Sequence, residues 1–155
     1  MPAGSRAVFS YSLRAAMALI LLSIAGVACA IDNPDAPDRV AAFEIRAAPF
    51  EQQLAATDGG SAATREGRTY ALFLNTELNT AYRALLAQLR DAPRKALIES
   101  QRQWLRFRDT ELRFIEVYWT PERSGSSANL SRAGYSNAVA KERILQLLRY
   151  SAEYP

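Results

Sequence analysis

Apolar residues recur every three to four positions along most of the chain, the spacing that places them on one face of an α-helix. The pattern predicts a first helix that begins near Asp35, is kinked or broken at Pro49 and ends near Ala56. Turns rich in Gly, Pro, Asp and Ser separate this helix from later ones. Three further helices are predicted over residues 63–90, 93–118 and 135–150.

No segment alternates apolar and polar residues as a half-buried strand would. Short connections between long helices favour antiparallel neighbours. The sequence therefore predicts an all-α fold, an up-and-down antiparallel bundle of three to four helices, in a single domain over residues 31–155. The segment 121–134 is rich in Ser, Gly and Asn and is predicted to be a loop.

Residues 1–30 have the layout of a cleaved secretory signal peptide. Two arginines precede an apolar run, which ends in the small residues Ala28, Cys29 and Ala30. The run is short for a membrane-spanning helix, which needs about 20 residues. We therefore expect cleavage after Ala30, a periplasmic or secreted protein, and no membrane span in the mature chain.

Cys29 is the only cysteine of the chain and supports a second interpretation. A cysteine at the end of such a run can be the lipidated first residue of a lipoprotein, and would then anchor the protein to a membrane. That signal usually has a Leu-like residue three positions earlier, where this chain has Gly26. Cleavage after Ala30 leaves no cysteine for a disulfide, so the fold would rest on helix packing alone.

The charge of the chain argues against nucleic acid as a partner. Arg6 and Arg14 are two of 19 basic residues and lie in the predicted signal peptide, so the mature chain has 17 basic and 16 acidic residues and a net charge of +1. A nucleic-acid-binding domain needs a concentrated basic surface. The basic residues here are interleaved with acidic ones.

The composition also argues against catalysis. The chain has no histidine, and the mature chain has no cysteine if cleavage follows Ala30, which removes the commonest general base and the soft metal ligands. Carboxylates on the predicted third helix, such as Glu99 and Glu116, form no obvious pair in an apolar cleft. We expect solvated or ion-paired carboxylates, no enzyme activity, no cofactor and no metal site.

The predicted third helix carries polar residues on or beside its apolar stripe, among them Gln101, Arg108 and Glu111. A half-buried arginine needs an acceptor, because an unpaired buried charge is costly. One interpretation is a structural clamp, in which Arg108 reaches Glu111 or the second-helix residues Asn75 and Asn79. The other is a recognition patch for a partner. We favour the clamp, and we expect Trp104 to be a core residue.

The run from Gln101 to Asp109, Q-R-Q-W-L-R-F-R-D, resembles the central motif of the lysozyme inhibitor LprI-like N-terminal domain family. Upstream, residues 75–82 resemble the D-x-x-L-N-x-x-Y helix of this family, and downstream a Gly–Ser stretch and Arg143 with Leu147 resemble its last segments. The resemblance covers residues 65–150. It assigns to the motif the residues Asn79, Tyr82, Gln101, Trp104, Arg108, Asp109 and Arg143.

Similar members usually carry cysteines where this chain has Leu112 and Tyr135, so the chain resembles a divergent, cysteine-free member in which apolar packing replaces a disulfide. The resemblance implies a non-enzymatic envelope protein that binds a protein partner, a lysozyme. Such an inhibitor would block the cleft in which the enzyme cleaves cell-wall glycan with two carboxylates. The alternative is a structural or stability module of the cell envelope that inhibits no lysozyme.

By its chemistry, the best candidate for partner contact is the predicted loop after Pro121. It is small and flexible, and its arginine can bind a carboxylate in a bidentate way. The alternative is an ordinary surface connection. Near it, Tyr118 and Trp119 are candidates for an exposed, adhesive surface at the helix end. The candidate loop residues are Arg123, Ser124, Gly125, Ser126 and Ser127.

Overall fold

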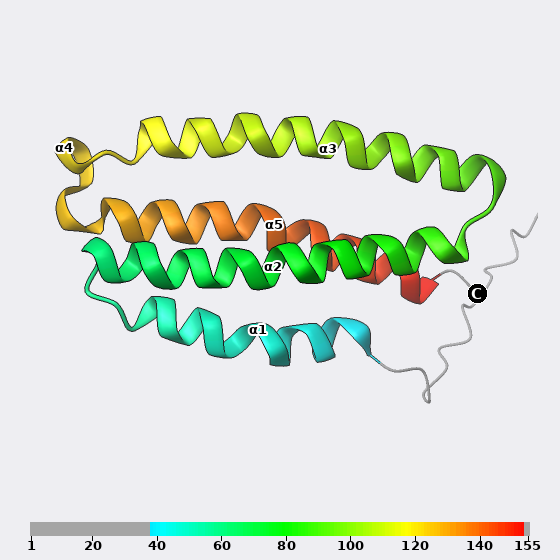
Figure 1. Ribbon diagram of the computed structural model, residues 1–155, viewed down its shortest axis with the longest axis horizontal. Coiled ribbons are helices and arrows are strands. Elements are labelled where there is room, and N and C mark those ends of the chain that lie inside the picture. Colours follow the sequence, from blue (N-terminus) through cyan, green and yellow to red (C-terminus); the bar gives the residue numbers. More distant parts are fainter. Residues whose placement is uncertain (1–37, 154–155) are drawn as a thin grey trace, which may run out of the picture. The chain divides into compact units, whose positions relative to one another are not determined.

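The computed structural model describes residues 38–153, and every regular element in this range is helical. The chain runs back and forth, so that consecutive long helices are antiparallel (Figure 1). The predicted all-α, up-and-down bundle is therefore confirmed for this range. The predicted signal peptide, Cys29 and the predicted cap Asp35 lie outside the described residues. The elements are α1 (Arg39–Ala55), α2 (Gly60–Gln88), α3 (Asp91–Tyr118), α4 (Pro121–Ser124), the 3-10 turn η1 (Gly125–Ser127) and α5 (Ala128–Glu153).

The helices α2 and α5 form the centre of the bundle. They are not consecutive in the chain, and the up-and-down order makes them run parallel to each other. They approach closely at Gly67, where an added Cβ would stand 2.5 Å from the Cβ of Ala133. The side-chain amide of Asn137 donates to the Gly67 carbonyl oxygen over 3.1 Å, and that of Asn129 donates to the Gly60 carbonyl oxygen over 3.1 Å. Glycine and these two amides thus fix the distance and the register of the central pair.

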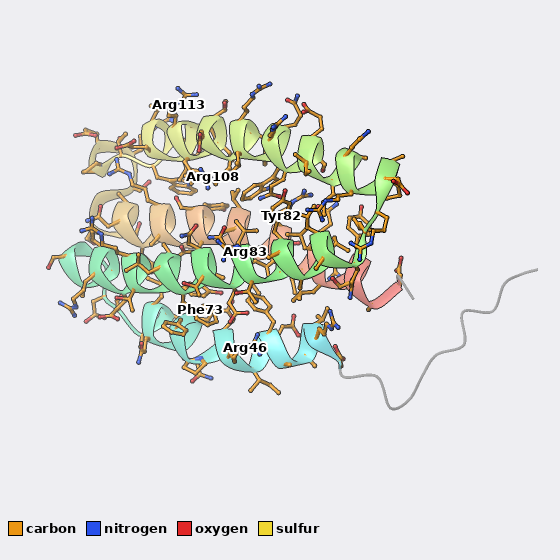
Figure 2. All side chains as sticks on the ribbon, turned by 45° about the vertical axis from the view of Figure 1, so that its right-hand side comes forward. Arg46, Phe73, Tyr82, Arg83, Arg108 and Arg113 are labelled. Carbon is orange, nitrogen blue, oxygen red and sulfur yellow. The ribbon has the colours of Figure 1, made fainter. Side chains whose placement is uncertain are left out.

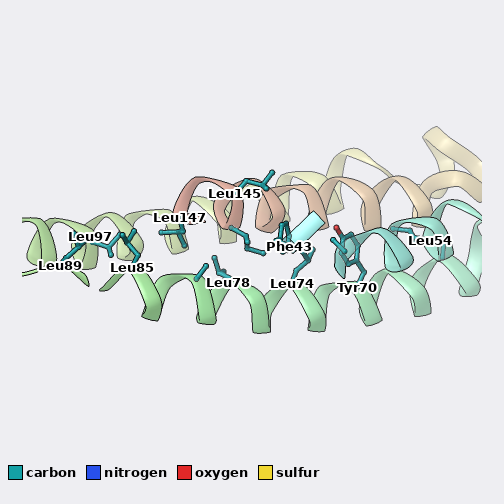
Figure 3. Close-up of a cluster of buried hydrophobic side chains, with 14 residues drawn as sticks. Phe43, Leu54, Tyr70, Leu74, Leu78, Leu85, Leu89, Leu97, Leu145 and Leu147 are labelled. Atoms are coloured by element: carbon teal, nitrogen blue, oxygen red, sulfur yellow. The ribbon is translucent and has the colours of Figure 1, made fainter. Parts of the chain in front are cut away.

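The core is built mainly from apolar residues at helical spacing on α1, α2 and α5, and Leu97 of α3 joins it (Figure 3). Apolar residues recur at helical spacing along the predicted second helix, and most of them are buried: Leu74, Leu78, Ala81, Leu85 and Leu89 are buried, whereas Ala71 is exposed. On the α1 side, Phe50 stacks on Phe73 with ring centroids 4.5 Å apart. Burying a large apolar side chain contributes about 1.5–3 kcal/mol, so each buried residue of this core stabilises the fold appreciably. The largest fully buried side chains are Phe43, Leu74, Ile144 and Leu147.

The helix α1 is continuous through Pro49, so of the predicted kink or break at this residue the break is wrong. Pro49 cannot donate to the carbonyl group of Ile45, but both residues are on the exposed side of the helix. Water can bond that carbonyl oxygen there, so the proline is tolerated. The helix begins after Asp38, whose carboxylate accepts a hydrogen bond from the Ala41 amide over 2.9 Å.

Two helices begin earlier than predicted. The helix α3 begins at Asp91, which has φ of 44°, and Arg90 occupies the N-cap position. The predicted loop over 121–134 is helical for almost all its length, and α5 begins at Ala128. Ala128 is buried, and Leu130 is partly buried against the core. Their apolar contacts stabilise helical turns that the Ser, Gly and Asn content did not predict.

The helix α3 is the least covered of the long helices. Its buried residues are Leu97, Gln101 and Ile115, and it packs mainly on α5. Trp104 is only partly buried, so the prediction of a core tryptophan is corrected. Within residues 38–153, no helix combines the length and the apolar character that crossing a membrane requires.

Candidate functional site

Aromatic side chains gather where α3 ends and α5 begins. The rings of Phe114 and Tyr118 lie 5.4 Å apart, and Tyr118 meets Trp119 edge to face at 5.2 Å. Trp119 in turn stacks on Tyr135 of α5 at 5.3 Å. The guanidinium group of Arg123, on α4, lies over the Tyr118 ring at 5.0 Å. We call these five residues the aromatic corner.

The aromatic corner is apolar in character but faces solvent. The exposed fractions are 57% for Phe114, 55% for Tyr135 and 44% for Tyr118. Tyrosine, tryptophan and arginine supply a large share of the binding free energy at protein interfaces. The corner therefore has the composition of a protein-binding surface; of the two residues expected to be exposed there, Tyr118 is exposed and Trp119 is partly buried.

The segment that carries Arg123 is ordered by local contacts. Backbone amides of α4 donate to the Thr120 carbonyl oxygen over 2.9 and 3.1 Å, and the Ser127 hydroxyl donates to the Ser124 carbonyl oxygen over 2.7 Å. The buried Gly59, between α1 and α2, has φ of 91°, and a Cβ there would stand 2.5 Å from the Ser126 carbonyl oxygen. The predicted flexible loop is therefore a structured turn that rests on the α1–α2 connection.

Arg143 is the polar centre of the contact between α3 and α5, with only 6% of the residue exposed. Its Nε donates to Oε1 of Gln101 over 3.1 Å, and its Nη2 donates to Oγ of Ser100 over 3.1 Å. Its Nη1 donates to Oε1 of Gln146 over 2.6 Å. Burial lowers the pKa of Arg143 from its ordinary value. Trp104 lies beside the guanidinium group, 5.9 Å from ring centroid to Cζ.

Arg108 is not the clamp that the sequence suggested. Its Nε and Nη2 donate to Oδ1 of the adjacent Asp109 over 3.0 and 2.7 Å, and 30% of its side chain is exposed. Its guanidinium group also lies 5.6 Å from the centroid of Trp104. Among residues 38–153, Arg108 makes no hydrogen bond with the predicted partners Asn75, Asn79 and Glu111.

The motif residues divide between two grooves on either side of α3. A groove of about 260 Å³ between α2 and α3 holds four of them, and Figure 2 shows Arg108 and Tyr82 facing this gap while Arg113 points away from the bundle. A larger groove of about 600 Å³, which we call the α3–α5 groove, is lined by Trp104 and Arg143. Asp109 is exposed and lines neither groove. The four residues of the smaller groove are Asn79, Tyr82, Gln101 and Arg108.

The sequence did not lead us to predict that Phe114 and Tyr135 are part of the aromatic corner. A signal was present, because Phe107, Phe114 and Tyr118 recur at seven- and four-residue spacing beside the buried stripe. Tyr135 is exposed and stacks on Trp119, so the apolar packing expected at this position lies at the surface.

A second polar cluster, also missed, joins α1, α2 and α5. The Tyr70 hydroxyl and Lys141 Nζ each donate to Oε1 of Glu51 over 2.7 Å. Burial opposes ionisation of Glu51, but the hydrogen bonds from Lys141 and Tyr70 outweigh it and lower the pKa of this carboxyl group. Burial, and then the hydrogen bond to Glu51, raise the pKa of Tyr70. The three groups satisfy one another, so the cluster serves packing.

In the described part of the chain, no group of His, Cys, Asp and Glu side chains is arranged to hold a metal ion. A comparison with protein-family models matches residues 60–147 to the family described as Lysozyme inhibitor LprI. Comparisons with curated proteins and with solved structures gave no significant match. The matched segment is more than half of the chain and contains both the aromatic corner and the Arg143–Gln101 pair. The chain belongs to the lysozyme inhibitor LprI family.

Proposed function

We propose that the protein is a non-enzymatic inhibitor that binds the substrate cleft of a lysozyme in the periplasm or outside the cell. The description of its family supports the choice of partner. The layout of residues 1–30 supports export and removal of a signal peptide. The partner-binding surface in this proposal is the aromatic corner.

One observation carries the proposal, which is the position of Arg123 on an exposed aromatic surface. Lysozymes cleave glycan with two carboxylates held in a cleft. A guanidinium group can donate two parallel hydrogen bonds to one carboxylate, and such charge-assisted pairs are strong. Within residues 38–153 the side chain of Arg123 makes no hydrogen bond, so its N–H groups are available. The rings of Phe114, Tyr118 and Tyr135 supply apolar area around it.

The order of the corner favours tight binding. A flexible loop would lose conformational entropy on binding, which reduces affinity. The hydrogen bonds at Thr120 and the close contact between Gly59 and Ser126 limit that loss, because the segment is already held in one conformation. Of the loop residues predicted as the site, Arg123 presents the side chain for contact, and Ser124, Gly125, Ser126 and Ser127 form the turn that positions it.

The test is a titration of lysozyme activity with the mature protein, over a panel of unrelated lysozymes and a cell-wall glycan substrate. We expect competitive inhibition of at least one enzyme, in which KM rises and kcat is unchanged, because inhibitor and substrate compete for the cleft. If no lysozyme of the panel is inhibited, the proposal fails and the structural or stability module of the envelope becomes the better account.

A further inference from the structure

The α3–α5 groove contains a buried cation without an anionic partner. Arg143 lines this groove, and all three of its acceptors, in Ser100, Gln101 and Gln146, are neutral oxygens. None of the ion pairs formed within residues 38–153 involves Arg143. A buried charge without a counter-charge is costly, so the position favours binding of an anion.

The guanidinium group also retains hydrogen-bonding capacity. It has five N–H donors, of which three are used in the bonds described above. The two remaining donors suit a carboxylate, whose planar oxygens match the guanidinium fork.

The groove is lined largely by apolar residues, together with charged groups. Phe107 of α3 and Tyr135 of α5 line it and are 54% and 55% exposed. The carboxylates of Glu111 and Glu142 and the guanidinium group of Arg149 line the same groove. The carboxylates would repel a simple anion, but they can accept hydrogen bonds from N–H groups. The volume of about 600 Å³ is that of a small-ligand site.

We propose that the α3–α5 groove binds the C-terminal end of a peptide. The terminal carboxylate pairs with Arg143, and the last side chain packs against Trp104 and the other apolar walls. Backbone N–H groups of the peptide donate to Glu111 and Glu142, which distinguishes a peptide end from a bare anion. Tyr135 belongs both to this groove and to the aromatic corner, but Arg143 is not part of the aromatic corner, so the proposal does not depend on lysozyme inhibition.

The first test compares two peptides that differ only at the C-terminus. The chain has two tryptophans, so a Trp119→Phe variant, which keeps an aromatic ring beside Tyr135 of the groove, reports on Trp104 alone by fluorescence. The probes are acetyl-Ala-Ala-Phe with a free carboxylate and the same peptide as its carboxamide. We expect saturable binding of the acid, and binding about tenfold or more weaker for the amide. Equal binding of the two peptides, or binding of neither, would overturn the proposal.

The second test supplies the missing anion from within the protein. A Gln101→Glu substitution places a carboxylate at the position that now lies 3.1 Å from Nε of Arg143. We expect this variant to stay folded by circular dichroism and to bind the acid peptide no better than the amide. Arg143→Met, which keeps an apolar contact with Trp104, should likewise bind the acid peptide no better than the amide. Gln53→Glu, at an exposed position on α1, is the charge-matched control and should bind as wild type does.

Unchanged peptide affinity in Gln101→Glu would contradict the assignment of Arg143 as the carboxylate-binding group. Lysozyme inhibition by Gln101→Glu should remain at the wild-type level, because the aromatic corner is intact in this variant. The two proposals can therefore fail independently of each other.

Discussion

Nε of Arg143 on α5 donates to Oε1 of Gln101 on α3 over 3.1 Å, which joins two residues of the sequence motif across a helix interface. Gln101 is one of only three buried residues on α3, so this bond lies at the main attachment of α3 to the bundle. These motif residues therefore stabilise the packing of α3 on α5, in addition to any surface that the motif presents.

Replacement of Arg143 should therefore be costly, whereas replacement of Arg108 should not. Arg143→Ala leaves the buried acceptor of Gln101 without its donor, and we expect the free energy of unfolding to fall by about 2–4 kcal/mol. Arg108→Ala removes an exposed pair with Asp109 and should cost no more than about 1 kcal/mol. Urea denaturation of both variants measures these values. A larger loss for Arg108→Ala than for Arg143→Ala would restore Arg108 as the clamp.

The contact between α2 and α5 predicts opposite effects for two glycine substitutions. Gly67→Ala places a Cβ 2.5 Å from that of Ala133, so the helices must separate, and we expect a loss of about 1–3 kcal/mol. Gly134→Ala on α5 meets open space and should gain about 0.5–1 kcal/mol from helix propensity. Thermal or urea denaturation compares the two. Stabilisation by Gly67→Ala would show that the central helices are not in close contact.

The Glu51 cluster predicts part of the acid sensitivity of the fold. Because its pKa is lowered below the ordinary value of 4.5, ionised Glu51 stabilises the protein above that value, and the contribution is lost as the pH falls through the lowered pKa. We expect Glu51→Gln to lose less stability than wild type between about pH 6 and about pH 3. The effect should be modest, since 41% of the Glu51 side chain is exposed.

Urea denaturation at several pH values measures this dependence. Glu44→Gln is the control, because Glu44 is exposed on the same helix and forms no ion pair within residues 38–153. It should follow the pH profile of wild type. If Glu51→Gln follows that profile too, the cluster has no part in acid sensitivity.

The periodicity of the sequence predicted the helices and most of the α2 stripe, because burial of one face dominates helix formation in a bundle. It did not predict the close pairing of α2 with α5. That pairing depends on Gly67 facing Ala133, 66 residues later in the chain, and a single sequence does not show which small residues face each other. Local composition also misled, since Ser and Gly between 121 and 134 suggested a loop where tertiary contacts stabilise helical turns.

For the candidate site, the motif identified the residues but not their partners. Spacing placed Arg108 near the buried stripe, yet a guanidinium group on a long side chain can turn toward a neighbour such as Asp109. Arg143 was assigned only through the resemblance, and its bond to Gln101 depends on the packing of α3 on α5. The aromatic corner likewise forms from residues of three helices, so its rings meet only in the folded protein.

The most direct measurement of the central claim is lysozyme inhibition by two arginine variants of equal charge change. Arg123→Glu places a negative charge where the partner cleft carries carboxylates, and repulsion should weaken inhibition by about 100-fold or more. Arg83→Glu changes an exposed arginine near the C-terminal end of α2, makes the same change in net charge, and should inhibit as wild type does. Circular dichroism checks that both variants are folded. Strong inhibition by wild type and Arg83→Glu with little by Arg123→Glu supports the aromatic corner as the inhibitory surface, whereas equal inhibition by all three proteins would contradict it.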